Sequence, residues 1–135
     1  MIEVRKIKEG FSGLFSSTYI EKGDLVLDLK KVAYHRWQFP FPFVATRDTP
    51  TRTSIQVDGK HIEHHLGAFI NHHCKPNTQV YTDHAVIIAK KDISPNEEIT
   101  IDYEQTESEL AEPFFCSCCK DKEIIGKKQR IPQPN

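Results

Sequence analysis

Short alternations of hydrophobic and polar residues recur along the chain, and this period of two predicts β-strands. The alternation, or an apolar run of similar length, is found in residues 2–7, 25–30, 55–58, 80–90 and 99–102. The first of these segments is expected to form an edge strand. Asp83-His84 divides the fourth into a hairpin, and Asp58-Gly59, after the third, is a turn signal. The pattern therefore predicts a mostly β domain.

Two other segments interrupt the strand pattern. The best helical signal covers residues 106–111, where Thr106 is expected to cap a single turn that Pro113 closes. Between residues 37 and 50, prolines alternate with aromatic side chains, which favours an ordered loop. The aromatic residues of this loop are expected to pack in the core, with peptide binding as the alternative: Trp37, Phe39, Phe41 and Phe43.

Residues 20–26 and 93–99 share a weak pattern, in which an isoleucine is followed by a turn and then by a strand. Gly23 in the first segment and Asn96 in the second are residue types that tolerate a positive φ. Two such units are too few for a repeat protein. They predict two similar turn–strand corners within one fold.

Length and composition indicate one globular domain without a membrane-spanning segment. The chain has 135 residues, of which 38% are hydrophobic and 27% are charged. Its longest apolar runs are far shorter than the ~20 residues needed to cross a bilayer. Its first residues lack the apolar stretch of a signal peptide, so we expect an intracellular protein. The net charge of −1 provides no overall field to attract nucleic acid or an anionic membrane.

Clustered cysteines and histidines raise the alternative of a metal-binding protein with a different fold. Cys118 and Cys119 are adjacent, a poor geometry for a disulfide with each other, so the cysteines are candidate metal ligands or reduced thiols. Segment 61–65 lacks the His-Glu-x-x-His spacing of zinc enzymes, and its histidines are expected to be surface or strand-end residues. The candidate ligands of this alternative are His61, His64, His65, His72, His73 and Cys74.

Four motifs in a fixed order carry the clearest functional signal. Residues 12–16 read Ser-Gly-Leu-Phe-Ser, residues 67–77 read Gly-Ala-Phe-Ile-Asn-His-His-Cys-Lys-Pro-Asn, residues 96–103 read Asn-Glu-Glu-Ile-Thr-Ile-Asp-Tyr, and residues 113–118 read Pro-Phe-Phe-Cys-Ser-Cys. In this order they resemble the motifs of the SET-domain lysine methyltransferases, over about residues 3–119. The resemblance implies small sheets and short helices around a threaded, knot-like core. It also implies a SET domain over residues 1–112 and a post-SET-like tail over residues 113–135.

The resemblance implies a site for S-adenosylmethionine. Asn71 and His72 match the family's pair that contacts the cofactor, and Ser12-Gly13 matches the turn whose backbone approaches it. Phe11 stands where the family has its first glycine. The cofactor-binding residues expected from the resemblance are Phe11, Ser12, Gly13, Asn71, His72, Tyr103 and Phe115.

Tyr103 matches the family's catalytic tyrosine, whose hydroxyl lies beside the transferred methyl group. Methyl transfer from a sulfonium is an in-line displacement, so catalysis depends mainly on positioning and desolvation. The attacking lysine has to be neutral, although its reference pKa is ~10.4. A dry channel beside a cationic sulfonium favours that neutral amine. The resemblance thus implies methylation of a lysine ε-amine in a protein or peptide.

The cysteines in the tail resemble the family's zinc-binding post-SET cysteines. Cys74, Cys116 and Cys118 match three of the four positions, while Glu123 stands at the last one and Cys119 is the substitute fourth ligand. Four thiolates suit tetrahedral zinc, and reduced thiols that pack without metal are the alternative.

Two readings other than an active methyltransferase stay open from the sequence. Phe11 and Ala68, which replace a glycine and an arginine of the family motifs, favour an inactive SET-fold module that binds peptides. The His/Cys metal protein is the second alternative. A second copy of the chain is a candidate partner, because a small domain can complete its peptide groove by dimerising.

Overall fold

The computed structural model describes residues 2–32, 44–51, 53–107, 114–115 and 123–124 of the chain. The aromatic residues expected to pack between positions 37 and 43 lie outside these ranges, as do Cys116, Cys118 and Cys119. Within the described ranges no helix is long and apolar enough to cross a membrane.

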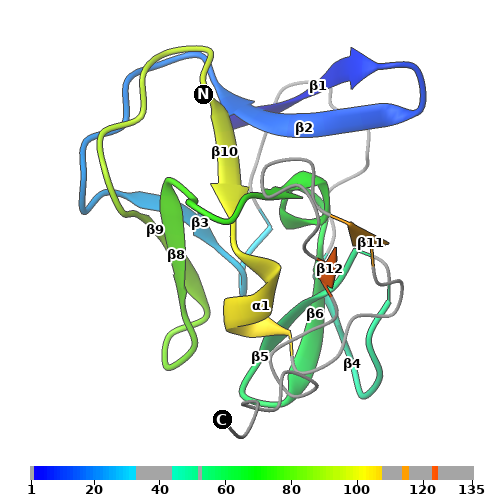
Figure 1. Ribbon diagram of the computed structural model, residues 1–135. Coiled ribbons are helices and arrows are strands. Elements are labelled where there is room, and N and C mark those ends of the chain that lie inside the picture. The colour runs from blue at the N-terminus through cyan, green and yellow to red at the C-terminus, as the bar shows by residue number, and fades with distance from the viewer. Residues whose placement is uncertain (1, 33–43, 52, 108–113, 116–122, 125–135) are drawn as a thin grey trace, which may run out of the picture.

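The described residues form three small sheets and a two-stranded ribbon, which confirms the prediction of a mostly β fold (Figure 1). The largest sheet has the order β1 (Ile2–Lys8), β2 (Phe11–Ser16), β10 (Glu98–Ile101) and β7 (Asn71–His72). The second has the order β3 (Leu25–Asp28), β9 (Val86–Ala89) and β8 (Thr78–Tyr81). The third has the order β4 (Val44–Arg47), β6 (Lys60–His64) and β5 (Ile55–Val57), and the ribbon pairs β11 (Phe114–Phe115) with β12 (Glu123–Ile124).

Two short helical turns complete the described structure. The 3₁₀ turn η1 (Gly67–Phe69) precedes β7, and the helix α1 (Tyr103–Thr106) follows β10. In Figure 1, β10 runs down the middle of the molecule, between the β3–β9–β8 sheet and the β4–β6–β5 sheet, and leads directly into α1. The chain thus carries its central strand straight to Tyr103.

Several predicted strands and turns are confirmed. β1 lies at the edge of its sheet, and β8 and β9 form the antiparallel hairpin expected around residues 83–84. Asp58 and Gly59 have φ values of 49° and 77°, and they connect β5 to β6. Two consecutive positive φ values suit the tight turns that join two antiparallel strands.

The regular alternation expected for residues 25–30 is wrong in detail. Leu25 is 57% exposed, whereas its neighbours Val26 and Leu27 are both buried. The register of β3 against β9 shifts between Leu25 and Leu27. An irregularity of this kind places two successive residues against one partner, so side chains on either side of it no longer alternate strictly.

The helix predicted to begin at Thr106 begins earlier. Asp102 is the N-cap of α1, because its carboxylate accepts a hydrogen bond from the backbone N–H of Glu104 at 3.0 Å. Thr106 is the last residue of the turn and is buried, so it does not cap a following helix. The predicted continuation to residue 111 falls mostly outside the described residues.

The two predicted turn–strand corners are present, and they pair with each other. Ile20 and Ile93 exchange backbone hydrogen bonds of 2.9 and 2.8 Å. Gly23 and Asn96 have φ values of 93° and 68°, as the turns require. The N–H of Gly23 donates to Ala89 at the end of β9, and the N–H of Asn96 donates to Ser16 at the end of β2. The pairing of Ile20 with Ile93 therefore joins the β2–β10 strand pair to the β3–β9 strand pair.

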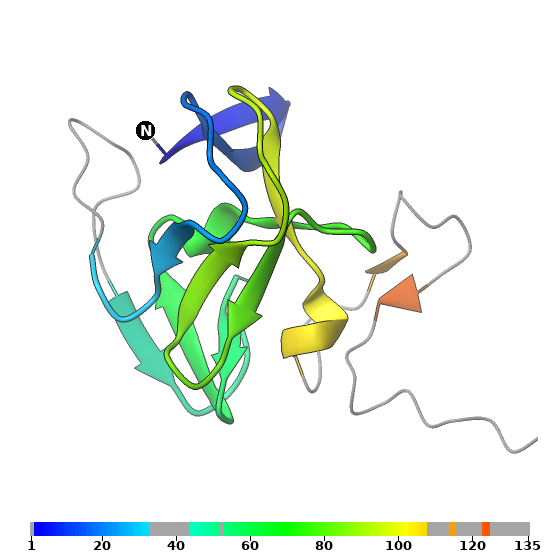
Figure 2. The same cartoon turned by 90° about the vertical axis from the view of Figure 1, so that its left-hand side faces the viewer.

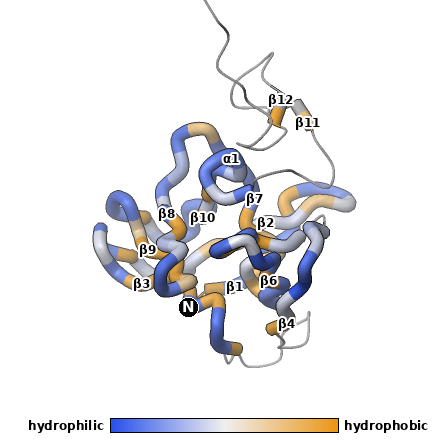
Figure 3. The backbone as a smooth tube through the Cα atoms, turned by 90° about the horizontal axis from the view of Figure 1, so that it is seen from below, coloured by the Kyte–Doolittle hydropathy of each residue, from blue (hydrophilic) through white to orange (hydrophobic). Residues whose placement is uncertain are grey.

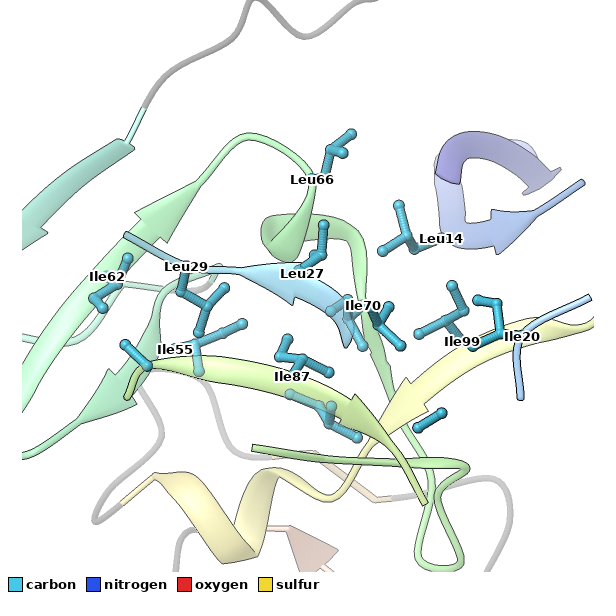
Figure 4. Packing of buried hydrophobic residues seen from close by; sticks show 14 of the residues in the cluster. Leu14, Ile20, Leu27, Leu29, Ile55, Ile62, Leu66, Ile70, Ile87 and Ile99 are labelled. Atoms are coloured by element: carbon cyan, nitrogen blue, oxygen red, sulfur yellow. The ribbon is translucent and has the colours of Figure 1, made fainter. Parts of the chain in front are cut away.

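The hydrophobic core is a continuous row of aliphatic side chains between the sheets (Figure 4). Leu14 and Ile99 lie near one end, where β2 meets β10, and Leu29, Ile55 and Ile62 lie near the other (Figure 4). Orange and blue segments alternate along the tube of Figure 3, as expected for strands with one buried face. This core holds β10 in place, and β10 carries the motif that ends at Tyr103.

The histidines of segment 61–65 lie at or next to the ends of β6, as expected, but they are buried, so the alternative of a surface location is wrong. His61, His64 and His65 are 6%, 1% and 1% exposed. His64 satisfies its ring within the fold: Nδ1 accepts the backbone N–H groups of Leu66 and Gly67, both at 3.1 Å. Its Nε2 lies 2.8 Å from the carbonyl oxygen of Lys31. Such bonds offset the cost of burying an imidazole, which the pattern of polar residues cannot predict.

Candidate functional site

Two of the motifs lie side by side in the structure. β10 and β7 pair in parallel, with Thr100 opposite Asn71 and Ile101 opposite His72. The N–H of His73 extends the pairing by donating to the carbonyl oxygen of Ile101 at 2.9 Å. Asn71, His72 and Tyr103 are therefore brought to one region of the molecule, as the sequence predicts. The threading of this region into a knot stays a prediction.

The Asn71 side chain links this region to the first motif. Its Nδ2 group donates to the carbonyl oxygen of Ser12 at 2.9 Å and to Oε2 of Glu98 at 2.7 Å. Both amide hydrogens are thereby used, which fixes the orientation of the side chain. Within the described part of the chain, Oδ1 of Asn71 accepts no hydrogen bond. The amide thus presents a half-buried, oriented acceptor beside a carboxylate.

Gly13 lies against the same group of side chains. A Cβ atom at this position would come within 2.5 Å of Oε2 of Glu98, 2.9 Å of Cδ1 of Ile7 and 3.2 Å of Nδ2 of Asn71. The predicted reason for this glycine is close approach to the cofactor. The structure adds another reason, because a side chain at this position would require the ends of the Glu98 and Ile7 side chains to move.

Glu98 also belongs to the site, although its place in the 96–103 motif predicts no role for it. The available signal was the period of two in β10, where the buried Ile99 and Ile101 alternate with Glu98 and Thr100. That alternation places Glu98 on the face opposite the core residues. It does not reveal that this face meets Gly13 and Asn71, because those contacts join segments far apart in the sequence.

Phe11 and Ser12 occupy the start of β2. Ser12 contributes its backbone carbonyl to Asn71. Phe11 is 42% exposed, and the ammonium group of Lys8 lies 5.6 Å from its ring centroid. Gly10, with φ of 74°, makes the turn before it. The structure thus brings Ser12 and Gly13 to Asn71, whereas the described contact of Phe11 is with the neighbouring strand.

His72 connects β7 to the start of α1. Its Nδ1 accepts the backbone N–H of Tyr103 at 3.0 Å, and its Nε2 lies 3.4 Å from Sγ of Cys74. Because Nδ1 is an acceptor, the neutral ring carries its proton on Nε2 and donates it toward the sulfur. The His72 side chain, 2% exposed, therefore holds the first residue of α1 and also contacts the one cysteine that the structure describes.

The Tyr103 hydroxyl donates a hydrogen bond of 2.6 Å to the carbonyl oxygen of Ile70, the residue immediately before Asn71. Burial raises the pKa of this phenol above its ordinary value, and the carboxylates of Glu107 and Glu98 raise it further. The hydroxyl is consequently neutral at physiological pH. Its proton points to a backbone carbonyl, and its oxygen lone pairs remain to accept contacts from a neighbouring group.

Three aromatic rings enclose this end of the site. The ring centroids of His72 and Tyr103 are 5.3 Å apart, and Phe114 lies 5.8 Å from His72 and 6.0 Å from Tyr103 in edge-to-face orientation. Figure 2 shows the β11–β12 ribbon on the same side of the molecule as α1. The sequence reasoning assigned the cofactor contact to Phe115. The ring described beside His72 and Tyr103 is that of Phe114.

The predicted zinc site lies mostly outside the described residues. Cys74 is half-buried, and the other three candidate cysteines fall in the range 116–122. Among the residues that the structure describes, no group of three histidine, cysteine or acidic side chains is arranged to hold a metal ion. Zinc binding by the four cysteines therefore stays a prediction.

Comparison with known proteins supports one family throughout. The SET domain family model matches residues 12–104. The chain is 36% identical over 67 residues to the histone-lysine N-methyltransferase TRX1 of rice, a match that covers 45% of this chain and 7% of that protein. The chain thus spans a small fraction of the curated relative it matches.

Two solved structures share the fold. The methyltransferase domain of human histone-lysine N-methyltransferase SETMAR superposes with a TM-score of 0.53 at 18% identity, covering 90% of this chain and 55% of that one. A candidate histone methyltransferase of Plasmodium falciparum superposes with a TM-score of 0.50 at 16% identity, covering 76% of this chain and 96% of that one. With the family match over most of its length and this shared architecture, the chain belongs to the SET-domain family, the protein-lysine methyltransferases.

Proposed function

We propose that this protein is an S-adenosylmethionine-dependent methyltransferase that acts on a lysine of another protein. The observation that carries the proposal is the adjacency of two oriented groups. Asn71 presents an acceptor beside Glu98. The hydroxyl of Tyr103 is held at the carbonyl oxygen of Ile70, the residue that directly precedes Asn71. The SET family uses S-adenosylmethionine, and the rice relative is named as a histone-lysine methyltransferase.

The residues around Asn71 suit the amino-acid end of this cofactor. An ammonium group needs acceptors, and Oδ1 of Asn71 is an oriented acceptor while the Glu98 carboxylate supplies negative charge nearby. When bound, S-adenosylmethionine supplies a methyl group on a sulfonium, which passes to the unprotonated lysine nitrogen and leaves S-adenosylhomocysteine and a proton. Asn71, Ser12 and Gly13 would hold the cofactor in this proposal, with His72 keeping the segment in place.

Tyr103 would orient the lysine. Its neutral hydroxyl is already bonded to Ile70, so its position does not depend on the substrate. Its lone pairs, together with backbone carbonyl oxygens, can orient the amine and accept weak C–H···O contacts from the polarised methyl group of the cofactor. The neighbouring rings of His72 and Phe114 would shield a bound amine from water, which would favour its uncharged form over the ammonium form.

The proposed domain organisation places the SET domain in residues 1–112 and a post-SET-like tail in residues 113–135. The described part of this tail supports the proposal, because Phe114 pairs with Ile124 and the Ile124 side chain is fully buried. We further propose an intracellular location, as expected for an enzyme acting on histone-like proteins. Zinc bound by Cys74 with the tail cysteines is testable by metal analysis of the purified protein, where one zinc per chain is the expected content.

The inactive peptide-binding module is the second candidate. It is favoured by Phe11, whose exposed ring occupies a position that carries glycine in the family motif. The two candidates differ in turnover rather than in binding.

Transfer of a labelled methyl group from S-adenosylmethionine to protein tests the proposal. Purified enzyme is incubated with core histones and with a lysine-peptide array, and Tyr103→Phe is compared with Tyr81→Phe, a tyrosine on the exposed face of β8. We expect label on lysine with the wild type and Tyr81→Phe, and a loss of about 100-fold in Tyr103→Phe. Label transfer that is unaffected in Tyr103→Phe contradicts the assigned role, and binding of cofactor without transfer favours the inactive module.

A further inference from the structure

Glu107, the residue that follows α1, contacts both the helix and a distant sheet. The backbone N–H of Glu107 donates to the carbonyl oxygen of Tyr103 at 2.9 Å and closes the helical turn. Its carboxylate Oε2 accepts the backbone N–H of Gln56, in the edge strand β5, at 2.8 Å. Glu107 is 5% exposed, which is unusual for a carboxylate. A buried charged acceptor of this kind is strongly tied to its donor.

Hydrogen bonds connect the β5–β6 hairpin to the segments that carry both partners of the Tyr103–Ile70 hydrogen bond. On one side, Gln56 in β5 holds Glu107, which holds the turn that carries Tyr103. On the other side, His64 at the end of β6 accepts the N–H groups that begin the η1 segment leading to Ile70. The Tyr103 hydroxyl and the Ile70 carbonyl are thus both connected through hydrogen bonds to the same hairpin.

We propose that Glu107 is a positioning residue, which docks the Tyr103 turn on β5 and so sets the tyrosine hydroxyl opposite the Ile70 carbonyl. Its effect on methyl transfer rests on the proposed function, whereas its effect on the position of Tyr103 does not. The carboxylate also lies close enough to Tyr103 to raise the pKa of the phenol, which is consistent with this proximity. The docking depends on the reach of the side chain and on an acceptor oxygen, not on the negative charge.

This requirement separates two conservative substitutions. Glu107→Gln retains the reach and an acceptor oxygen for Gln56 but loses the charge. Glu107→Asp retains the charge but is one methylene too short to meet Gln56 in the same backbone position. Positioning predicts that Glu107→Gln resembles the wild type and that Glu107→Asp resembles Glu107→Ala. A matched control is Glu63→Gln, because Glu63 is a buried carboxylate of the same sheet whose partners are the hydroxyls of Thr51 and Thr53.

The direct readout is NMR of the cofactor-free protein. The buried Tyr103 hydroxyl proton, assigned by its absence in Tyr103→Phe, reports the bond to Ile70, and amide exchange at Gln56 reports the bond to Glu107. We expect both signals to be retained in Glu107→Gln and Glu63→Gln. We expect Glu107→Asp and Glu107→Ala to lose protection at Gln56 by about tenfold or more and to lose the slowly exchanging Tyr103 hydroxyl.

Steady-state kinetics then connect position to rate. Displacement of a catalytic group should lower kcat more than it changes KM, so Glu107→Asp is expected to lose about tenfold in kcat with KM within about twofold. Two results would overturn the proposal: a Tyr103 hydroxyl signal that is unchanged when Gln56 protection is lost, or a Glu107→Gln variant that behaves like Glu107→Asp. If Glu107→Ala does not fold, comparison of Glu107→Asp with Glu107→Gln still tests the proposal. Because the NMR signals need no methyl transfer, failure of this inference is distinguishable from failure of the proposed function.

Discussion

At the scale of single residues, the candidate site is built from a few polar groups that hold one another. Asn71 uses both amide hydrogens on Ser12 and Glu98, and Tyr103 is held through its hydroxyl by Ile70 and through its backbone N–H by His72. Each group that would touch cofactor or lysine is therefore oriented before either arrives. Such preorganisation is the main source of rate in a displacement that needs no nucleophilic side chain.

The raised pKa of Tyr103 predicts a loss of stability in alkali. The phenol titrates near 10.0 in the unfolded chain and higher in the folded protein, so above pH 10 the folded state binds more protons and the free energy of unfolding falls as pH rises. Between pH 9 and pH 11 the wild type should lose about 1 kcal/mol more than Tyr103→Phe. Denaturant unfolding at the two pH values measures this. Each protein is compared with itself at the two pH values, so the hydrogen bond that Tyr103→Phe lacks at both does not affect the difference. Equal losses of unfolding free energy in the two proteins would contradict the burial of the phenol.

A side chain at Gly13 should displace the ends of the Glu98 and Ile7 side chains. In Gly13→Ala, the Cβ would meet Glu98 and Ile7 at less than 3 Å, and it would displace the carboxylate that orients Asn71. We expect a cost of about 1–3 kcal/mol in unfolding free energy and about tenfold weaker binding of S-adenosylmethionine. Thermal unfolding and titration of the same preparation separate the two effects. Wild-type affinity in Gly13→Ala would show that Glu98 has no part in orienting Asn71.

At the scale of elements, the two mutually paired corners hold the central strand in register. Asn96 and Gly23 make equivalent turns, and the strands that follow them, β10 and β3, belong to different sheets. Ile20 and Ile93 join the corners through paired backbone bonds. A disturbance at either corner is therefore expected to reach β10 and the residues at its end.

Substitution at Asn96 tests this element. Asn96 has φ of 68°, a conformation that β-branched residues adopt only with strain. Asn96→Val should cost about 1–2 kcal/mol in unfolding free energy. Asn96→Gly, which relieves the backbone but loses the 2.8 Å bond from Arg5, should stay within about 0.5 kcal/mol of the wild type. Equal stability of the two variants, measured by denaturant unfolding, would argue against a strained corner.

Elements could be predicted from the sequence where one face of a strand is buried and the chain is locally regular. The hairpin around residues 83–84, the Asp58-Gly59 turn and both corners follow from local patterns alone. The break in β3 at Leu25 and the buried histidines did not, because a register shift and a buried imidazole depend on partners distant in sequence. The Asn71–Glu98 contact has the same origin. Position in a motif predicted which segments matter, but the contacts between them came from the fold.

At the scale of the whole molecule, one SET domain occupies most of the chain. The family match begins at Ser12, the second residue of β2, and ends at Glu104 in α1, so it includes every strand from β3 to β10. The described structure brings Asn71 and His72, Tyr103 and the β11–β12 ribbon to one region. In this arrangement the sheets act as supports, and the segments that leave their ends carry the proposed chemistry.

The most direct test of the account is calorimetric titration of the full chain with S-adenosylmethionine, with Asn71→Ala as the matched variant. We predict saturable binding at one site per chain in the wild type. We predict at least about tenfold weaker binding in Asn71→Ala, because the oriented acceptor is lost, at a temperature where the variant is still folded although it lacks the bonds to Ser12 and Glu98. Absence of binding in a folded wild type, or equal affinity in both proteins, would contradict the proposed cofactor site at Asn71.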